Sequence, residues 1–238
     1  MTGRLGRLSA EGAVVVSHAP ERAHWLARIA RATASLTLPV FLSVLTLMVA
    51  WELRATPLTS LDGVFAPSDA PELRPSAWLG VGHAIVPVLF LLSNLVNRRY
   101  GEDYAIAFVL ASWAFAALTT LAIIYRIDPS LAAPPVVPTL RVAASFFGAM
   151  VIAQLLGVFV FDRTRGVDWW KAPLYSALTS AFVATFLFYP FAFAGDEWTW
   201  LNHMSIDAGV KAAMSFALLL PYLALRSIVR PLGGFGGF

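Results

Sequence analysis

The sequence predicts an all-α, polytopic integral membrane protein folded as a bundle of six transmembrane helices. Its composition points to lipid as the main solvent, because 58% of the 238 residues are hydrophobic and only 13% are charged, whereas a soluble domain is about a quarter charged. Its apolar residues gather in six runs of about 20 residues, enough to cross a hydrocarbon core of about 30 Å. Lipid offers no hydrogen bonds to bare backbone, so these runs should be helices.

Three regions are expected along the chain. Residues 1–31 should form a cytoplasmic tail, in which Trp25, Leu26 and the neighbouring arginines favour a short interfacial helix. Residues 32–230 should form the transmembrane domain, and the Gly- and Phe-rich residues 231–238 a flexible tail. The six expected helices are Ala32–Trp51, Ala77–Val96, Tyr104–Tyr125, Val142–Phe161, Ala172–Ala194 and Ala208–Val229.

The basic residues predict the orientation of the helices. Twelve of the 17 lysines and arginines lie before the first span, after the sixth, or in the second-to-third and fourth-to-fifth connections, and four lie in the other connections. By the positive-inside rule both termini face the cytoplasm, which suits a multi-pass protein of the inner membrane. Because the basic residues lie at helix ends, the net charge of +3 does not indicate a nucleic-acid partner.

Familiar catalytic chemistry is not expected. The chain has no cysteine, which excludes disulfides and thiolate chemistry. Its four histidines are scattered without metal-ligand spacing, and no nucleophile-elbow, phosphate-loop or zinc-protease motif is present. We therefore expect neither an enzyme nor a bound metal or cofactor.

Polar residues inside the sixth span form a candidate site. Lys211 lies about one turn inside the predicted helix and four residues after Asp207, so the two share a face, which Ser215 and Tyr222 continue. Such residues are costly in lipid and usually face the protein, which favours a substrate- or proton-handling face. The alternative is that Lys211 snorkels to the interface and pairs with Asp207 for structure alone.

A second stripe lies in the second span, where His83, Pro87, Phe90 and Asn94 follow one helical face. His83 could carry a proton, Asn94 could bind a ligand and Pro87 could break the helix locally. The alternative is a packing face with a proline kink.

Two more features concern the fourth and fifth spans. The amide of Gln154 could bind a polar ligand edge or tie two helices together, and the second role is the commoner one. Ser176, Ser180 and Ala184 form a ridge of small residues that lets another helix approach.

Several short motifs follow one another from the second span onward, each occurring once. The motifs are Val86–Leu91 followed by Arg98, Tyr100 and Gly101; Arg141–Phe147; Gln154; Val160–Arg165; Trp169–Pro173; and Asp207 with Lys211, Ser215 and Pro221. In the order and spacing of these motifs, over about residues 80–230, the chain resembles the VUT family of membrane proteins, the queuosine precursor transporters.

The resemblance implies a six-helix inner-membrane carrier for a 7-deazaguanine such as 7-cyano-7-deazaguanine. It places the recurring polar positions of the family at Asn94, Arg141, Gln154, Asp207 and Lys211. The chain departs from the family pattern in three places, with Asn94 for an aspartate and with Ala181 and Ala184 for a serine and an aspartate. These departures point to a changed or more apolar substrate, or to a lost transport role.

Two functions are therefore in competition. The first is a transporter that binds a small planar solute near mid-membrane, with Gln154 and Asn94 as hydrogen-bonding groups, Asp207–Lys211 as a gate or coupling pair, and Phe90, Phe147 or Tyr222 stacking on the ring. The second is a non-transporting scaffold subunit that binds partner proteins. The lipid bilayer is a partner in both cases, and a homo-oligomer is left open. The candidate binding residues are His83, Phe90, Asn94, Arg141, Gln154, Asp207, Lys211, Ser215 and Tyr222.

Overall fold

The computed structural model describes residues 21–62, 74–122, 140–195 and 200–232, and for residues 21–32 and 140 the backbone alone. The chain divides into two units, residues 1–35 and 36–238, and the account below concerns the second. The predicted cytoplasmic tail and its interfacial helix fall mostly outside the described side chains, as does the predicted flexible tail at 231–238. These predictions therefore stay predictions.

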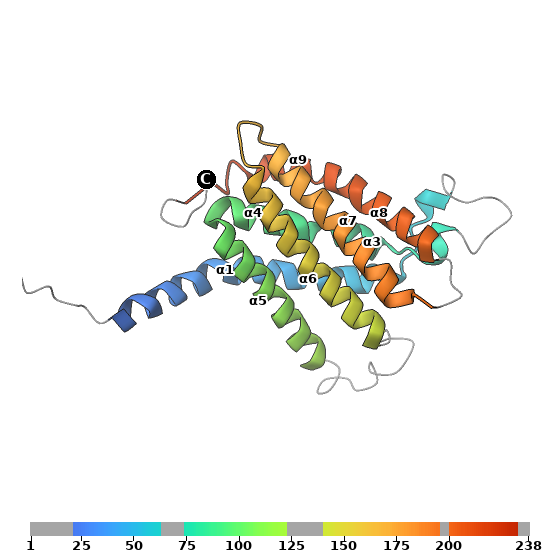
Figure 1. Ribbon diagram of the computed structural model, residues 1–238, viewed down its shortest axis with the longest axis horizontal. Helices are drawn as coiled ribbons and strands as arrows, with labels where there is room; N and C mark the ends of the chain where they lie inside the picture. The colour runs from blue at the N-terminus through green and yellow to red at the C-terminus, as the bar shows by residue number, and fades with distance from the viewer. Residues whose placement is uncertain (1–20, 63–73, 123–139, 196–199, 233–238) are drawn as a thin grey trace, which may run out of the picture. The chain divides into compact units, whose positions relative to one another are not determined.

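The described chain is helical, with one isolated antiparallel bridge between Pro57 and Gly80. Six of its segments are long and apolar enough to cross a membrane, which confirms the predicted class. Figure 1 shows α5, α6, α7 and α8 side by side in chain order. The α-helices are α1 (Glu21–Glu52), α3 (Val81–Ile85), α4 (Val88–Tyr100), α5 (Glu102–Ala122), α6 (Leu140–Arg163), α7 (Lys171–Phe193), α8 (Trp200–Ala217) and α9 (Leu219–Leu225), and the short 3-10 helices are η1 (Leu53–Ala55), η2 (Thr59–Leu61) and η4 (Pro75–Ala77).

Two spans are interrupted, each beside a proline. The second is divided into α3 and α4 at Val86 and Pro87, where the proline cannot donate a backbone hydrogen bond to the carbonyl of His83. The sixth is divided into α8 and α9 at Leu218, because Pro221 cannot donate to the carbonyl of Ala217. The local break predicted at Pro87 is present, whereas the one at Leu218 was not predicted.

One clear difference from the predicted boundaries is at the start of the sixth span. We expected it at Ala208, but α8 begins at Trp200. His203 and Asp207 lower the local hydropathy, so the apolar run starts late in the sequence. Both side chains are buried against the protein, and the helix extends through them into the membrane region.

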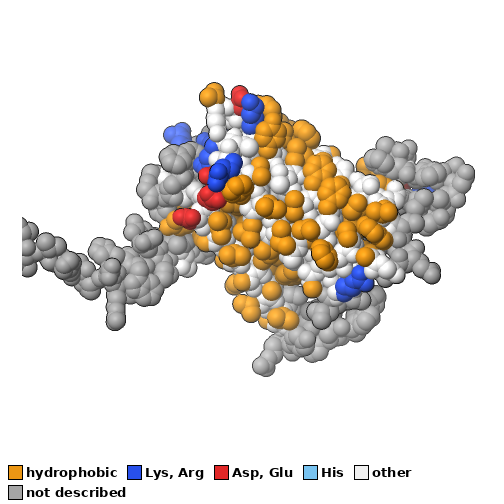
Figure 2. Space-filling view, in the orientation of Figure 1, with side chains coloured by type: hydrophobic (Ala, Val, Ile, Leu, Met, Phe, Trp, Pro, Cys, Tyr) orange, Lys and Arg blue, Asp and Glu red, His pale blue; other side chains and the backbone are white. Residues whose placement is uncertain are grey.

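Burial differs between the spans in a way that suits a bundle in lipid. The second span is the most enclosed, with 61% of its most apolar window buried, against 22% for the sixth. Large apolar side chains such as Phe115, Leu118 and Phe191 are exposed on the outer helices. Figure 2 shows hydrophobic side chains across the middle of one face and charged side chains near its ends. This is the distribution expected of a lipid-facing surface.

Helices α6 and α7 approach closely through small residues. A Cβ added to Gly157 would lie 2.1 Å from the Ser180 Oγ and 3.3 Å from the backbone oxygen of Ser176. Ser180 donates a hydrogen bond of 3.0 Å to the carbonyl of Ala153 on α6. The small-residue ridge predicted on the fifth span therefore lets another helix approach, as small residues do between membrane helices.

Candidate functional site

A cavity with about 60 Å³ of open space lies among α3, α6, α7 and α8. We call it the upper cavity. Its polar groups come from two helices, since α3 contributes His83 and α8 contributes Asp207 and Lys211. Its remaining wall is apolar, so that three ionisable side chains meet on an otherwise hydrophobic surface. The full lining is His83, Val86, Phe146, Met150, Ala184, Phe188, Asp207 and Lys211.

Asp207 and Lys211 form a buried ion pair in this cavity. The Lys211 Nζ lies 2.5 Å from the Asp207 Oδ2, and the two side chains are 6% and 1% exposed. Thr185 of α7 joins the pair, because its hydroxyl accepts a hydrogen bond of 3.1 Å from Lys211 and donates one of 3.3 Å to the same Oδ2. The other carboxylate oxygen, Oδ1, is buried and has no hydrogen-bond partner among the described residues. That oxygen is an unused acceptor beside the cavity.

The position of Lys211 argues against snorkelling. The sequence placed it about one turn into the sixth span, but α8 begins eleven residues earlier, at Trp200. At about 1.5 Å per residue, Lys211 lies about 16 Å along a helix that crosses a core of about 30 Å. A lysine at that depth needs a partner within the protein, and it has two in Asp207 and Thr185.

A second and smaller cavity, of about 10 Å³, lies among α4, α7, α8 and α9. We call it the lower cavity, because it lies further toward the carboxyl end of the sixth span than the upper cavity does. It contains three of the predicted binding residues, Asn94, Ser215 and Tyr222. Asn94 is already engaged, since its amide donates to the Pro173 carbonyl at 3.0 Å and accepts from the Ser176 hydroxyl at 2.7 Å. Ser215 donates to the carbonyl of Lys211 at 2.8 Å, so its hydroxyl bonds within its own helix.

The other three predicted binding residues do not line either of these cavities. Phe90 lies in the main hydrophobic core. Arg141 donates to the carbonyls of Phe191 and Ala194 at 2.8 and 2.6 Å, which satisfies the carboxyl end of α7. Gln154 accepts from the Trp113 indole and donates to the Leu89 carbonyl and the Ser93 hydroxyl, at 3.2 and 3.0 Å. These bonds tie α4, α5 and α6 together, which is the commoner role considered for this amide.

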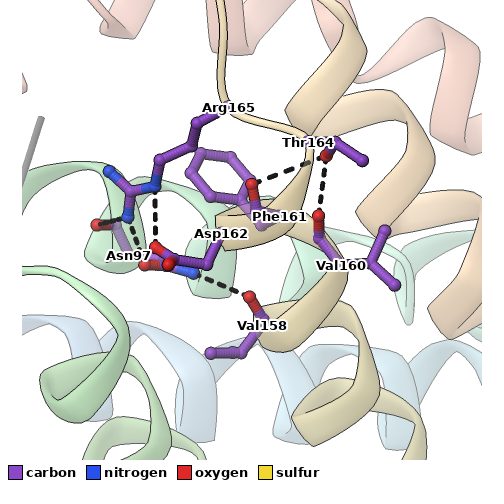
Figure 3. Close-up of polar contacts among 7 residues, drawn as sticks. All are labelled: Asn97, Val158, Val160, Phe161, Asp162, Thr164 and Arg165. Carbon is purple, nitrogen blue, oxygen red and sulfur yellow. Dashed lines mark hydrogen bonds and ion pairs between the residues drawn. The ribbon is translucent and has the colours of Figure 1, made fainter.

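The end of α4 is fastened to the connection after α6 by a polar cluster (Figure 3). The guanidinium of Arg165 lies between Asn97 and Asp162, donating to the Asn97 side chain at 2.6 Å and pairing with Asp162 at 2.8 Å. Asn97 in turn donates to the carbonyl of Val158 on α6 at 3.0 Å. The cluster holds α4 and α6 together at the end of the bundle that carries most basic residues.

Comparison with known proteins identifies the family. A family described as "Putative vitamin uptake transporter" matches residues 80–225, from the start of α3 to the end of α9. The chain belongs to this family. A Haemophilus influenzae protein named "Probable queuosine precursor transporter" is 30% identical over 173 residues, which cover 66% of this chain and 72% of that protein. No solved structure matches the chain. The resemblance seen in the motifs is confirmed, and the protein is a multi-pass membrane transporter for a small-molecule solute.

Four residues near the transporter's upper cavity were missed by the sequence reasoning. Phe188 follows Ala184 by four residues and so extends the small-residue ridge that was already recognised, and Phe146 precedes Gln154 by eight residues, which places both on one face of a helix. His203 lies four residues before Asp207 and packs edge-on against Trp78, with ring centroids 4.2 Å apart. The sequence did contain these spacings. Thr185 had no such signal, because its role depends on α7 facing α8.

Metal chemistry has no visible support in the described part of the transporter. Within residues 21–62, 74–122, 140–195 and 200–232, no group of three His, Asp or Glu side chains is arranged to hold an ion. The cavity groups are instead hydrogen-bond donors and acceptors beside aromatic rings. That combination suits recognition of a planar organic solute.

Proposed function

We propose that the transporter carries a planar, polar heterocycle of the 7-deazaguanine class, and that the upper cavity is its binding site. The observation that supports this is the buried Asp207–Lys211 pair in the cavity wall, in which the Oδ1 atom of Asp207 has no hydrogen-bond partner among the described residues. A guanine-like lactam has adjacent N–H donors and a carbonyl acceptor. Asp207 would accept from the N–H groups and Lys211 would donate to the carbonyl oxygen.

The apolar wall of the cavity suits the faces of such a ring. Phe146 and Phe188 lie on the neighbouring helices α6 and α7, with their ring centroids 6.0 Å apart in an edge-to-face arrangement. An aromatic solute can stack on one of these rings while its polar edge meets α8. The relative from Haemophilus influenzae is named for a queuosine precursor, which belongs to this chemical class.

The size of the cavity sets a condition on this proposal. Pockets for small organic ligands usually measure about 300–1,000 Å³, and the upper cavity has about 60 Å³. Binding must therefore widen it.

Uptake of labelled 7-cyano-7-deazaguanine into cells that cannot synthesise it is the direct test. Cells that express the chain should accumulate the label, and cells that express Asp207→Asn should not. Asp207→Asn removes the charge but keeps the size of the side chain. Absence of uptake from a protein shown to be correctly inserted would exclude this solute, and uptake of another labelled purine would redirect the proposal to that compound.

The orientation, membrane and assembly belong to the same proposal. The twelve basic residues that the sequence assigns to one side of the predicted spans support an inner-membrane protein with both termini in the cytoplasm. Reporter fusions to the carboxyl terminus that are active on only one side of the membrane would test this. Cross-linking of the purified protein would decide whether it works as a homo-oligomer.

A further inference from the structure

The wall of the upper cavity has a polar group outside α8, and the short helix α3 presents it. His83 of α3 lines the cavity together with Asp207 and Lys211 of α8. Helix α3 is only five residues long, and the span is interrupted after it at Val86 and Pro87. A helix this short is not stable on its own. The place of His83 in the cavity therefore depends on what packs against α3.

Two buried glycines bring the start of α3 against the backbone at the end of α1. A Cβ added to Gly80 would lie 1.8 Å from the carbonyl oxygen of Arg54, and one added to Gly82 would lie 2.1 Å from that of Ala50. Atoms at these distances overlap, so only glycine lets the two backbones meet here. Since both oxygens belong to the backbone, a larger residue could be accepted only if α3 moved.

Backbone hydrogen bonds join the same two segments. The N–H of Leu58 donates to the carbonyl of Leu79 at 3.0 Å, and the N–H of Val81 donates to the carbonyl of Thr56 at 2.8 Å. These bonds accompany the isolated antiparallel bridge of the fold. With the glycines, they hold the start of α3 to the end of the first span. The whole junction, which we call the α1–α3 contact, consists of residues 50–58 and 79–82.

The α1–α3 contact extends to the ring of His83. The Nδ1 atom lies 3.2 Å from both the backbone nitrogen and the carbonyl oxygen of Gly80, so it accepts from the first or donates to the second, according to its tautomer. Among the described residues, the hydrogen bonds of this ring are made by Nδ1. The other ring nitrogen, Nε2, therefore has capacity for a solute in the cavity that His83 lines.

We propose that His83 is a second recognition group for the solute, and that the α1–α3 contact presents its Nε2 atom to the upper cavity. A 7-deazaguanine has polar groups on two edges, because the pyrrole N–H and the 7-substituent lie away from the lactam. Nε2 bonds the five-membered-ring edge while Asp207 and Lys211 bond the lactam. Gly80 and Gly82 are positioning residues, since they act on the solute through His83.

This proposal rests on the upper cavity being the solute site. It gives a role to the first span, which precedes the residues 80–225 that the family shares. Its tests compare variants with one another, and one of them uses no solute. An error in the identity of the solute is therefore distinguishable from an error in the positioning of His83.

Two variants of His83 separate recognition from capping of α3. His83→Asn keeps an amide at the place of Nδ1 and has nothing at the place of Nε2, whereas His83→Gln does the reverse. In uptake of labelled 7-cyano-7-deazaguanine, His83→Asn should raise the apparent KM about fivefold, the effect of losing one hydrogen bond. His83→Gln should stay closer to the wild type. A wild-type KM in His83→Asn would show that the ring only caps α3, and would overturn its recognition role.

Gly82→Ala tests the positioning role in a double-mutant cycle with His83→Asn. The added methyl group displaces α3 from Ala50 and should raise the apparent KM by up to about fivefold. Added to His83→Asn, it should cause no further rise, and effects that multiply would overturn the positioning role. Leu58→Pro removes only the donor to Leu79, and it gives the same cycle if Gly82→Ala does not insert.

The measurement without solute is ¹⁵N NMR of protein labelled at histidine. The His83 resonances are identified by their loss in His83→Asn. Gly82→Ala and Leu58→Pro should shift the Nδ1 resonance, because each changes how α3 lies relative to Gly80. An unshifted resonance in both variants would overturn the positioning role.

The control is Gly209→Ala on α8, the helix that carries the ion pair. Its added Cβ meets nothing within 4 Å, so both the Nδ1 resonance and the apparent KM should match the wild type. An equal shift in Gly209→Ala and Gly82→Ala would assign the effect to the bundle as a whole and overturn the proposal. Absence of uptake by the wild type would instead overturn the solute site, and with it the recognition role, while the NMR result would still decide the positioning of His83.

Discussion

The central helix α4 and the sixth span use buried polar groups in opposite ways. On α4, Asn94 and Asn97 have partners on other helices and on backbone carbonyls, so their polarity serves to hold the bundle together. On α8, Asp207 keeps one carboxylate oxygen without a described partner beside a cavity. The comparison teaches that burial alone does not mark a binding site in a membrane protein. An unused hydrogen-bonding capacity is the better indicator.

The largest effect should come from breaking the ion pair on α8. Lys211→Met leaves the Asp207 carboxylate buried without its cation, which should abolish uptake and lower the free energy of unfolding by about 3–5 kcal/mol. The double variant Asp207→Asn/Lys211→Met should recover much of that stability without recovering uptake. Thermal unfolding in detergent and uptake in cells measure the two quantities separately.

Lys171→Met is the matched control for that experiment. Its amino group lies 2.6 Å from Asp168, but both side chains are about half exposed. The variant should leave the free energy of unfolding nearly unchanged, because solvent screens exposed pairs. Normal uptake by Lys211→Met would instead place the ion pair among the structural contacts of the bundle.

A smaller effect is expected where Gln154 ties α4, α5 and α6 together. Gln154→Leu removes the acceptor of the Trp113 indole and the donors to Leu89 and Ser93. An unpaired buried polar group costs about 1–3 kcal/mol, so the melting temperature should fall. The apparent KM for the solute should stay unchanged, because Gln154 does not line the upper cavity. A raised KM with an unchanged melting temperature would instead show that the Gln154 amide contacts the solute. Ser205→Ala, at an exposed hydroxyl that bonds within its own helix, should alter neither quantity.

The packing of α6 against α7 gives a comparison between two glycines of α6. Gly157→Ala introduces a Cβ that would lie 2.1 Å from the Ser180 Oγ and should cost about 1–3 kcal/mol through overpacking. Gly148→Ala meets nothing within 4 Å and should be neutral, or stabilising by up to about 1 kcal/mol, because alanine favours helix. Equal melting temperatures for the two variants would show that α6 and α7 separate more easily than this contact implies.

The smallest effect should come from the connection between α1 and α3, outside the spans. Asp62 accepts hydrogen bonds from the backbone and the hydroxyl of Ser76, at 2.9 and 2.5 Å, and these bonds lower the pKa of Asp62 below its ordinary value of 3.8. The stabilisation is therefore fully present above pH 3.8 and is lost as the pH falls through the lowered pKa. The protection factor of the Ser76 amide, which is its exchange rate relative to that of an unprotected amide at the same pH, should fall only at that acidic pH. In Asp62→Ala the exchange should be fast and independent of this titration, and a wild-type profile without a step would contradict the assignment.

How far the sequence predicted the site depended on the kind of signal. The pairing of Asp207 with Lys211 follows from their spacing of four on a helix, and the break at Pro87 follows from the missing donor. Gln154 and Asn94 are polar residues in apolar spans, and nothing in the sequence could tell whether their partners would be a solute or another helix. Arg141 was carried over by family resemblance, and in the structure it satisfies the end of α7.

The sequence by itself determined the class of the protein, the number of its spans and the family to which it belongs. Those properties depend on hydropathy, helix length and local motifs, all of which are written along the chain. Only the tertiary structure decided which polar groups remain available, because each hydrogen bond that satisfies Asn94 or Gln154 comes from a residue more than 40 positions away. The packing of α7 against α8 likewise brought Thr185 to the ion pair and left one oxygen of Asp207 without a hydrogen-bond partner among the described residues.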